Sequence, residues 1–423
     1  MNILEHKTDT LSLVTIEGKS DLVQVRLSVD LHTKTTAHTR VVGEVYAHML
    51  LAGSASMSRL ELLDAFNKIG TRVTVRYHEG RLELAYSIHT RHHKDGLSLL
   101  TRVLQEPHFT TKELRRIRSV IQNELDQYRE MARGRAHDAL CNALYDKKDR
   151  RAVPSLSALG RAIQAVGLSD VRALHNKLME TPWKLTVAGS KQEISHTVHA
   201  LSSIQERTST TQPYHRQVAL SSATLDLISV PSKSNIEFSI GGPLPITCAH
   251  PDFPAFHFGM AVLGKWGGFT GRLMSTVRER EGLTYSIYAK IDTATTNELG
   301  YWRIMTFFDP ARAKQGLSST LREIKHIVAD GITVKELTRF KTILATQERL
   351  LADSITQTLN QRHQLHIASV SGAQYRSMQE RIQTLSKQDV DTVLQTYLDP
   401  TRLVVCGAGP VSGMQKNLEK VIK

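Results

Sequence analysis

The sequence predicts an α+β protein made of two homologous halves, each a mainly antiparallel sheet with helices packed on one face. The first observation behind this prediction is an internal repeat. TTKELRR at residues 110–116 returns as TVKELTR at 333–339, and KDGLS at 94–98 returns as KQGLS at 314–318. Both pairs occur in the same order and at nearly equal offsets, which favours duplication of a whole domain. The second observation is that strand-like and helix-like hydrophobic patterns follow one another along the chain.

In the first half, segments that alternate apolar and polar residues indicate strands, and apolar residues spaced three or four apart indicate helices. The dipeptide Glu79-Gly80 between two alternating segments predicts a hairpin, and Gly53 marks the end of the first long helix. The expected strands are residues 11–15, 22–31, 73–77, 82–88 and 184–188, and the expected helices are residues 41–51, 58–68, 94–105, 111–130, 136–145 and 168–179.

A polar segment near the middle of the chain predicts the boundary between the halves. Residues 206–217 (ERTSTTQPYHRQ) contain one proline and almost no apolar side chain, which is typical of a connection between domains. We therefore expect an N-terminal half at residues 1–205, a linker at 206–217 and a C-terminal half at 218–423. A chain of 423 residues is long enough for each half to bury its own core.

The composition is that of an ordinary globular protein, with 40% hydrophobic and 22% charged residues. The formal net charge of +13 favours acidic partners. The basic residues are scattered and form no nucleic-acid-binding motif, so we expect no nucleic acid partner. No apolar run is long enough to span a membrane, and the three cysteines lie too far apart to suggest a disulfide framework. The first residues lack a signal-peptide core, which predicts a cytoplasmic protein, or a periplasmic one if a signal peptide has been removed.

A glycine-rich stretch in the second half is the strongest candidate for a functional site. Four glycines lie within residues 264–271 (GKWGGFTG), and such a run predicts a loop that brings backbone close to another group. A short amphipathic helix follows and ends at Gly282, and residues 283–288 are expected to form a strand. Arg278 and Tyr285 would then place a guanidinium and a phenol at one end of a sheet, where both can reach a peptide carbonyl.

In order and spacing, these residues resemble the C-terminal half of the pitrilysin/insulinase family of zinc peptidases, the inverted zincins. The matching residues are GGF at 267–269, GRL at 271–273, Arg278 and GLTYS at 282–286. The resemblance extends at lower density over nearly the whole chain and implies the two-half, pitrilysin/insulinase-like fold. It also implies that Gly267, Gly268, Arg278 and Tyr285 bind substrate, and that Arg278 and Tyr285 contact the reacting peptide bond.

Catalytic members of the family carry His-x-x-Glu-His on the first long helix and another Glu on a later helix. The two histidines share a helix face and bind zinc, and the Glu between them is the general base for the metal-bound water. The positions in this sequence are Glu44 for the first ligand, Ala47 for the base, His48 for the second ligand and Glu124 for the third, and Ile117 replaces a supporting Glu. Because Ala47 cannot accept a proton, the resemblance implies a degenerate site, and we expect no metal in this chain.

Alternatives remain for these side chains and for two other histidine groups. Glu44, His48 and Glu124 could hold a metal through two oxygens and one nitrogen. Alternatively, His48 is a hydrogen-bonded core residue and Glu44 is solvated or ion-paired. The segments HTRHH at 89–93 and HQLH at 363–366 have spacings that suit metal ligands, but no carboxylate pattern accompanies them. We expect both groups to be solvated.

Small members of this family often work as pairs, in which one subunit keeps the zinc motif and the other supplies the Arg and the Tyr. The resemblance implies that this chain is of the second kind, a non-catalytic subunit of a heteromeric zinc metallopeptidase. It implies no cofactor in this chain, zinc in a homologous partner with an intact His-x-x-Glu-His, and an extended peptide as substrate. Tyr285 would donate a hydrogen bond to the scissile carbonyl oxygen, and Arg278 would anchor the peptide or hold Tyr285. Two alternatives are a metallopeptidase that is active by itself through an altered site, and a purely structural or assembly homologue.

Overall fold

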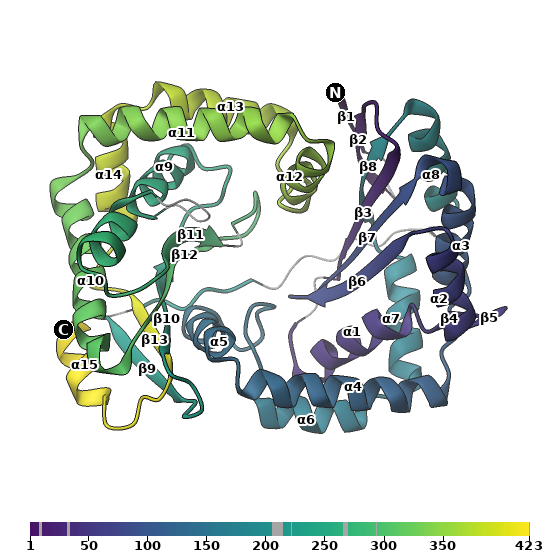
Figure 1. The fold of residues 1–423 in the computed structure, drawn as a ribbon, viewed down its shortest axis with the longest axis horizontal. Helices are drawn as coiled ribbons and strands as arrows, with labels where there is room; N and C mark the ends of the chain where they lie inside the picture. Colours follow the sequence, from purple (N-terminus) through teal and green to yellow (C-terminus); the bar gives the residue numbers. More distant parts are fainter. Residues whose placement is uncertain are drawn as a thin grey trace. The chain divides into compact units, whose positions relative to one another are not determined.

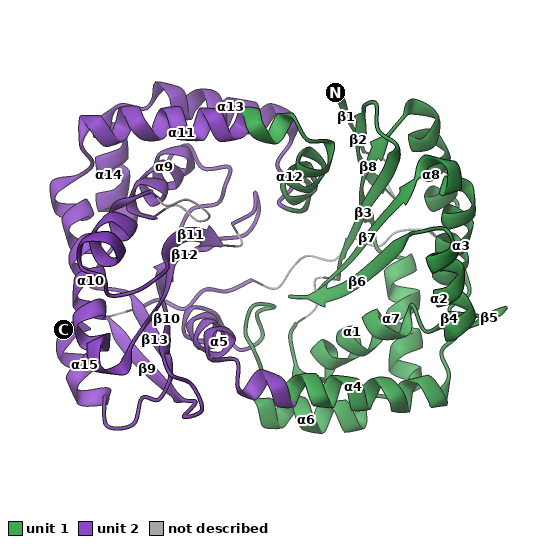
Figure 2. Ribbon diagram, in the orientation of Figure 1, with its two compact units in different colours: residues 1–125, 148–214, 349–367 green, residues 126–147, 215–348, 368–423 purple. Residues whose placement is uncertain are grey.

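The computed structural model describes residues 1–7, 11–31, 34–204, 215–220, 222–264, 270–292 and 294–422. These residues form two compact units (Figure 2). Unit 1 comprises residues 1–125, 148–214 and 349–367, and unit 2 comprises residues 126–147, 215–348 and 368–423. Each unit contains one large sheet with helices packed against it (Figure 1), which confirms the predicted α+β class.

The sheet of unit 1 has six strands in the order β1-β2-β8-β3-β7-β6. Only β2 and β8 pair in parallel, and the other neighbours are antiparallel. Along β3, Val23, Val25 and Leu27 enter the apolar core of the unit, and the residues between them lie on the opposite face. The strands are β1 (Asn2–Lys7), β2 (Leu11–Glu17), β3 (Leu22–Asp30), β6 (Arg72–His78), β7 (Arg81–His89) and β8 (Trp183–Gly189). The expected strands are all present, and β1 is an additional one.

The sheet of unit 2 has five strands in the order β11-β12-β10-β13-β9. Only β9 and β13 pair in parallel. Starting from β9, the strand order of this sheet is β9-β13-β10-β12-β11. In the first sheet, the corresponding strands are β2-β8-β3-β7-β6. The two sets of five strands follow one another along the chain in the same way and pair in the same parallel and antiparallel directions. The strands are β9 (Thr224–Ser229), β10 (Ile236–Pro243), β11 (Ile287–Asp292), β12 (Tyr301–Phe308) and β13 (Val404–Gly409). This agreement confirms the prediction of two homologous halves.

The first repeated segment begins a helix of 19 residues in each half, α4 (Thr111–Arg129) and α11 (Val334–Ala352). The Thr110 hydroxyl accepts a hydrogen bond from the backbone N–H of Glu113, and the Thr333 hydroxyl accepts one from Glu336. A threonine followed three residues later by a glutamate is the sequence pattern of a helix N-terminal capping box. The repeat therefore lies on the same kind of element twice, at the same place in that element.

The second repeated segment contains a glycine at a close approach between helix and sheet. Gly96 lies in α3 (His93–Gln105), where a Cβ atom would overlap the Tyr86 hydroxyl and the Ile88 side chain of β7. Gly316 lies in α10 (Ala313–Asp330), where a Cβ atom would overlap the Phe308 ring at the end of β12. Each helix follows a 3₁₀ turn, Thr90–His92 or Pro310–Arg312. A residue without a side chain is what allows both helices to lie directly on their strands.

Each half contributes one helix to the unit formed mainly by the other half. The helix α5 (Ala132–Leu144) contacts β10 and β13 and belongs to unit 2, whereas α12 (Ile355–Ile367) contacts β8, β3 and β2 and belongs to unit 1. On unit 1, Gln24 and Arg26 of β3 donate to Thr356 and Asn360 of α12. These strand residues lie opposite the apolar core, so α12 covers the second face of a sheet whose other helices lie on the first. The units thus exchange segments and are not two consecutive stretches of chain.

Some predicted boundaries are wrong, for reasons that local contacts explain. The first long helix was expected at 41–51, but α1 spans Ala37–Met49 because Thr36 and Thr39 form a capping box. The strand expected at 283–288 begins only at Ile287. The remaining helices are α2 (Arg59–Lys68), α6 (Leu156–Ala165), α7 (Leu168–Met179), α8 (Lys191–Ser202), α9 (Phe253–Gly264), α13 (Gly372–Thr384), α14 (Lys387–Tyr397) and α15 (Gln415–Ile422), with a π-helix at Met274–Arg280 and a two-stranded hairpin of β4 (Gly53–Ser54) and β5 (Met57–Ser58).

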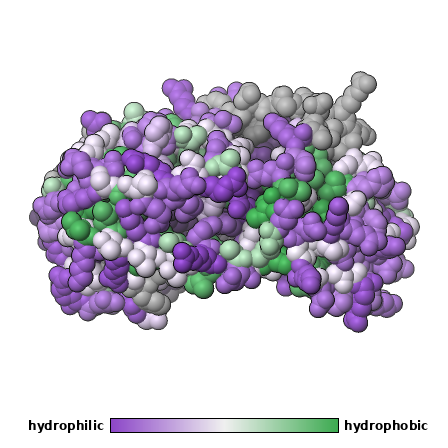
Figure 3. All heavy atoms as spheres, turned by 90° about the horizontal axis from the view of Figure 1, so that it is seen from above, coloured by the Kyte–Doolittle hydropathy of each residue, from purple (hydrophilic) through white to green (hydrophobic). Residues whose placement is uncertain are grey.

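Most of the predicted linker, residues 206–214 of 206–217, lies outside the described residues. Of the rest, Gln217 belongs to unit 2, where its side chain donates to the Tyr145 hydroxyl and to the Gly300 carbonyl. The face drawn in Figure 3 is mainly hydrophilic, with hydrophobic residues in smaller groups. Within the part of the chain that the structure describes, no helix is long and apolar enough to cross a membrane.

Candidate functional site

The helix α1 carries three of the degenerate metal positions. Its capping box at Thr36 fixes the start of the helix, and its apolar side, which includes Val45 and Tyr46, enters the core of unit 1. Glu44 and His48 lie one turn apart on the same side of the helix. Ala47 is buried and presents only a methyl group at the position of the general base.

The structure brings Glu124 of α4 to this side of α1. His48 Nε2 lies 3.6 Å from Glu124 Oε2, and Arg40 Nε lies 3.4 Å from Glu44 Oε1. Ile117, two turns before Glu124, is 1% exposed and belongs to the apolar core. The three predicted positions are therefore neighbours, and the site of the supporting glutamate is part of the hydrophobic packing.

The charged side chains of this cluster form ion pairs within α1 and between α1 and α4. Burial raises the pKa of the Glu44 carboxyl, although the ion pair with Arg40 acts in the opposite direction, and the Glu124 carboxylate raises it further. Among the described residues, no group of three or more His, Cys, Asp or Glu side chains is arranged to hold a metal ion. Glu44 pairs with Arg40 one turn earlier, and His48 pairs with Glu124. His48 is exposed, so the alternative of a core histidine is wrong.

The glycine-rich loop in the second half can be followed only at its ends. Gly267 and Gly268, which the resemblance implies as substrate-binding residues, lie outside the described residues, as does the rest of 265–269. After the loop, Arg272 donates from Nε and from a terminal nitrogen to the two carboxylate oxygens of Glu336, at 2.7 and 2.8 Å, and to the Gly331 carbonyl at 2.7 Å. This two-point ion pair holds the end of the loop against the start of α11.

The expected short helix is present as a π-helix, Met274–Arg280. This helix type is rare overall, but it occurs often at functional sites. The helix ends at Arg280, and Gly282 follows with a φ of 58°, in the left-handed region that glycine adopts without strain. Arg312, which sequence reasoning did not identify, donates to the carbonyl oxygens of Gly282 and Glu281 at 2.9 and 3.1 Å. The turn between helix and strand is thus fixed from outside by an arginine of the neighbouring 3₁₀ turn.

The structure brings Arg278 and Tyr285 together. The Arg278 guanidinium carbon lies 5.1 Å from the centroid of the Tyr285 ring, within the range of a cation–π contact. Tyr285 is 71% exposed and lies at a bend two residues before β11. Next to it, the Ser286 backbone N–H donates to the Thr284 hydroxyl, which fixes the local path of the chain. A phenol and a guanidinium are therefore presented together at the start of an edge strand of the second sheet.

The expectation that the other histidines are solvated is wrong for three of them. His93 is 2% exposed, with Nε2 3.2 Å from the Thr197 hydroxyl. His363 and His366 of α12 are 4% and 8% exposed. The Thr186 hydroxyl lies 3.0 and 3.3 Å from the Nδ1 atoms of His363 and His366. The burial of α12 could not be predicted from its polar sequence, because this helix packs on the polar face of a sheet.

Two profiles of one peptidase family match the chain. The profile described as "Insulinase (Peptidase family M16)" matches residues 42–153, and the profile described as "Peptidase M16 inactive domain" matches residues 186–344. The "Non-peptidase homolog YmxG" of Helicobacter pylori is 20% identical over 370 residues, which are 85% of this chain and 82% of that protein.

Solved structures share the fold over nearly its whole length. A peptidase M16 inactive domain from Pseudomonas fluorescens has a TM-score of 0.83 at 19% identity and covers 97% of this chain and 98% of its own. A protease from Helicobacter pylori has a TM-score of 0.81 at 14% identity, with 96% and 99% covered. At these identities the likeness shows the fold, and it agrees with the duplicated sheets described above.

Proposed function

Because the chain belongs to the insulinase family, peptidase family M16, we propose that it is a non-catalytic subunit of a heteromeric zinc metallopeptidase. The chain is similar to inactive members of the family. We propose further that it supplies Arg278 and Tyr285 to peptide hydrolysis at the zinc site of a homologous partner with an intact His-x-x-Glu-His motif. The substrate is an extended peptide, and zinc belongs to the partner and not to this chain.

The observation that carries this proposal is the Arg278–Tyr285 pair. An exposed tyrosine usually has several side-chain orientations, but a guanidinium 5.1 Å from the ring centroid restricts the ring through a cation–π contact. The turn before it is held by two hydrogen bonds from Arg312. The phenol is thus both exposed and preorganised, which is what a group that stabilises a transition state requires.

The chemistry of the pair suits the hydrolysis of a peptide bond. A phenol is neutral at pH 7 and donates one hydrogen bond, so it can stabilise the oxyanion that develops on the scissile carbonyl. Arg278 keeps Tyr285 in place and is close enough to bind a peptide carbonyl itself. The chemistry supplied by the partner's zinc is activation of the attacking water.

The degenerate site on α1 supports a role without catalysis by this chain alone. Ala47 cannot take a proton from water, and the loss of a positioned general base costs about 10²–10⁴ in rate. Glu44, at the first ligand position, forms an ion pair with Arg40. Ala47 thus stands in place of the general base of the intact motif, and Glu44 stands in place of its first zinc ligand.

The test is Tyr285→Phe in this chain, reconstituted with a zinc-motif homologue that copurifies with it. Removing one oxyanion donor should lower kcat about 10²–10³-fold and leave complex formation unchanged. Arg278→Ala should also raise KM, because it removes a contact to the bound peptide. Steady-state turnover and a binding measurement are made on the same complex. Tyr288→Phe, which removes a phenol from the neighbouring strand β11, is the matched control and should retain wild-type turnover.

A purely structural role is the second candidate, and it is supported by the likeness to a protein named a non-peptidase homolog. In that case Tyr285→Phe would leave turnover at the wild-type value in a fully formed complex. The same result would refute the proposed contribution of the Arg278–Tyr285 pair. Chelator-sensitive turnover by the isolated chain, abolished by His48→Ala, would favour the remaining alternative, a peptidase that acts alone through an altered site.

A further inference from the structure

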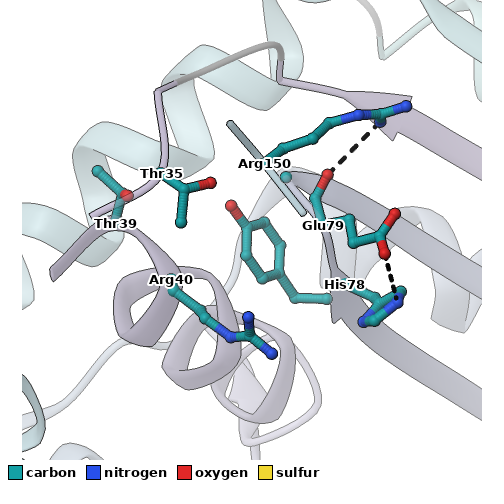
Figure 4. A pocket seen from close by; sticks show the side chains of 8 residues that line it. Thr35, Thr39, Arg40, His78, Glu79 and Arg150 are labelled. Carbon is teal, nitrogen blue, oxygen red and sulfur yellow. Dashed lines mark hydrogen bonds and ion pairs between the residues drawn. The ribbon is translucent and has the colours of Figure 1, made fainter. Parts of the chain in front are cut away.

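The small pocket beside the start of α1 is lined by charged side chains that are paired within unit 1. Figure 4 shows the Glu79 carboxylate directed at His78 and the Arg150 guanidinium directed at the Glu79 carbonyl oxygen, at 3.4 and 3.5 Å. These contacts stabilise the β6–β7 hairpin. Around Tyr285 in unit 2, by contrast, hydrogen bonds from β12 and from the turn after it hold the residues beside an exposed side chain.

The chain is held in place just before Tyr285. Leu283 is 4% exposed, and its backbone N–H donates to the Val277 carbonyl at 2.9 Å. Arg312, in the 3₁₀ turn that follows β12, donates to two backbone carbonyls of the turn before Leu283. Both contacts fix the backbone on the N-terminal side of Tyr285.

The Thr284 hydroxyl closes the bend at Tyr285. It accepts a hydrogen bond from the Ser286 N–H at 3.3 Å and donates one to the Ser286 carbonyl at 3.1 Å. The Thr306 hydroxyl of β12 donates to the same threonine oxygen at 3.3 Å. A hydroxyl has one donor and two acceptor positions, so all three bonds can form together. Thr306 thus connects the bend to the strand next to β11.

Thr306 is a polar residue on the apolar face of its sheet. It is 3% exposed, and its neighbours in register are Phe238 of β10 and Ile287 of β11, which both belong to the apolar core of unit 2. A valine would fill the same space without the free-energy cost of burying a hydroxyl. Among the described residues, the one hydrogen bond of this hydroxyl is the bond to Thr284. What the hydroxyl adds to the molecule is therefore its hold on the bend.

We propose that Thr306 is a positioning residue for Tyr285, and that Thr306 and Arg312 together hold residues 281–286 so that the phenol keeps one orientation. This inference rests on the proposed function, in which that phenol donates to the scissile carbonyl. Thr306 is buried and acts only through the bend. Removing its hydroxyl should therefore lower kcat more than it changes KM, because a displaced donor stabilises the transition state less well.

The first test is fluorine NMR of the full chain with fluorotyrosine at its 11 tyrosine positions. Tyr285→Phe identifies the Tyr285 signal by its disappearance. Thr306→Val keeps the shape of the side chain without the hydroxyl, and it should move the Tyr285 signal toward its position in the urea-unfolded chain. Thr306→Ser restores the hydroxyl and should restore the signal. Thr320→Val is the matched control, since it removes a similarly buried hydroxyl of unit 2 that donates to Gly316 within α10.

The second test is steady-state turnover of the same variants in complex with the zinc-motif partner. Thr306→Val should lower kcat about three- to tenfold, the range expected for the loss of one hydrogen bond, and Thr306→Ser should recover most of this loss. A role in packing alone predicts the opposite order, because serine leaves a cavity and valine does not.

The NMR signal separates this inference from the proposed function. Wild-type turnover by Tyr285→Phe would refute the proposed function, whereas the signal reports the orientation of the ring without any turnover. Thr284→Val is a second variant at the other end of the bond and should change the signal in the same way as Thr306→Val. The positioning role is refuted if both variants leave the Tyr285 signal unchanged, or if Thr320→Val changes it equally. It is also refuted if Thr306→Val has wild-type turnover while Tyr285→Phe is impaired.

Discussion

At the scale of single residues, Glu44 and Ala47 determine what α1 can do. His48 and Glu124 remain 3.6 Å apart, so one nitrogen and one oxygen ligand are already neighbours. The carboxylate of Glu44 is occupied by Arg40, and burial raises its pKa. The change at the first ligand position and the change at the general-base position are therefore separate, at two positions about one turn of the helix apart.

Glu44→His should restore zinc binding without restoring catalysis. Two histidines and a glutamate are a ligand set that zinc prefers, and the new imidazole would lie one turn before His48. We expect about one zinc per chain, measured by atomic absorption after dialysis, and no peptide hydrolysis because Ala47 remains. Glu44→Gln is the control and should not retain zinc. Absence of zinc from the His variant would show that Glu124 and His48 are not placed as ligands.

At the scale of elements, the repeated glycines set how closely helices approach their strands. Gly316→Ala places a methyl group against the Phe308 ring and should lower the free energy of unfolding by about 1–3 kcal/mol. Gly160→Ala in α6 is the control, since its methyl group meets only Leu125 at 3.8 Å and should stabilise the protein by about 0.5–1 kcal/mol. Urea unfolding measures both. Stabilisation by Gly316→Ala would contradict the close approach.

The contact of α12 with the first sheet should depend on pH. Burial lowers the pKa of His363 to about 3 and that of His366 to about 4, and the nearby Lys184 acts in the same direction on both. An unfolded histidine has a pKa of about 6.5. Between these values the unfolded chain binds more protons, so stability is full above about pH 6.5 and falls as the pH decreases toward the folded values.

At pH 4, protonation linked to each of these two histidines should lower the free energy of unfolding of unit 1 by on the order of 3 kcal/mol relative to neutral pH. Hydrogen exchange of α12 amides, compared at pH 7.5 and pH 4.5 after correction for intrinsic rates, measures the loss of protection. His366→Gln should reduce the pH dependence, whereas His108→Gln, at an exposed position of the same unit, should not. Equal protection of α12 at both pH values would contradict this account.

The elements also show how far sequence reasoning reaches. The Thr-x-Lys-Glu repeat located two equivalent helix starts, because a capping box is a local pattern. The spacing of Arg278 and Tyr285 likewise anticipated a pair that the structure brings into contact. The burial of His363 was not predicted, because a helix that packs on a polar sheet face has no periodic pattern of apolar residues in its sequence. The late start of β11 was missed because the turn before it is held by hydrogen bonds from Arg312, which is distant in sequence.

At the scale of the whole molecule, duplication is combined with an exchange of helices. Unit 1 is completed by α12 from the second half of the chain, and unit 2 is completed by α5 from the first half. Ser28 and Thr186 on the polar face of the first sheet are fully buried in the presence of α12. Without that helix these groups would be exposed to water on a sheet that has lost one of its layers.

We expect neither half of the chain to be stable alone. Residues 1–205 lack α12, and residues 215–423 lack α5, so each half exposes a sheet face that is otherwise buried. The two pieces expressed together should copurify and show the circular dichroism of the intact chain. Each piece alone should aggregate or show a much lower melting temperature. A well-folded monomer of residues 1–205 would show that α12 contributes little to unit 1.

The position of α12 in the chain also has a consequence for synthesis on the ribosome. The last strand of the first sheet, β8, ends at Gly189, but its covering helix ends at Ile367. At ordinary elongation rates of about 5–20 residues per second, the time between synthesis of β8 and completion of that helix is on the order of 10–35 s. We expect nascent chains stalled before Ser354 to be digested by protease and to bind chaperones, and chains stalled well beyond Ile367 to be protected. Because α12 is synthesised long after β8, the first sheet stays without its covering helix, and accessible to protease, during this part of translation.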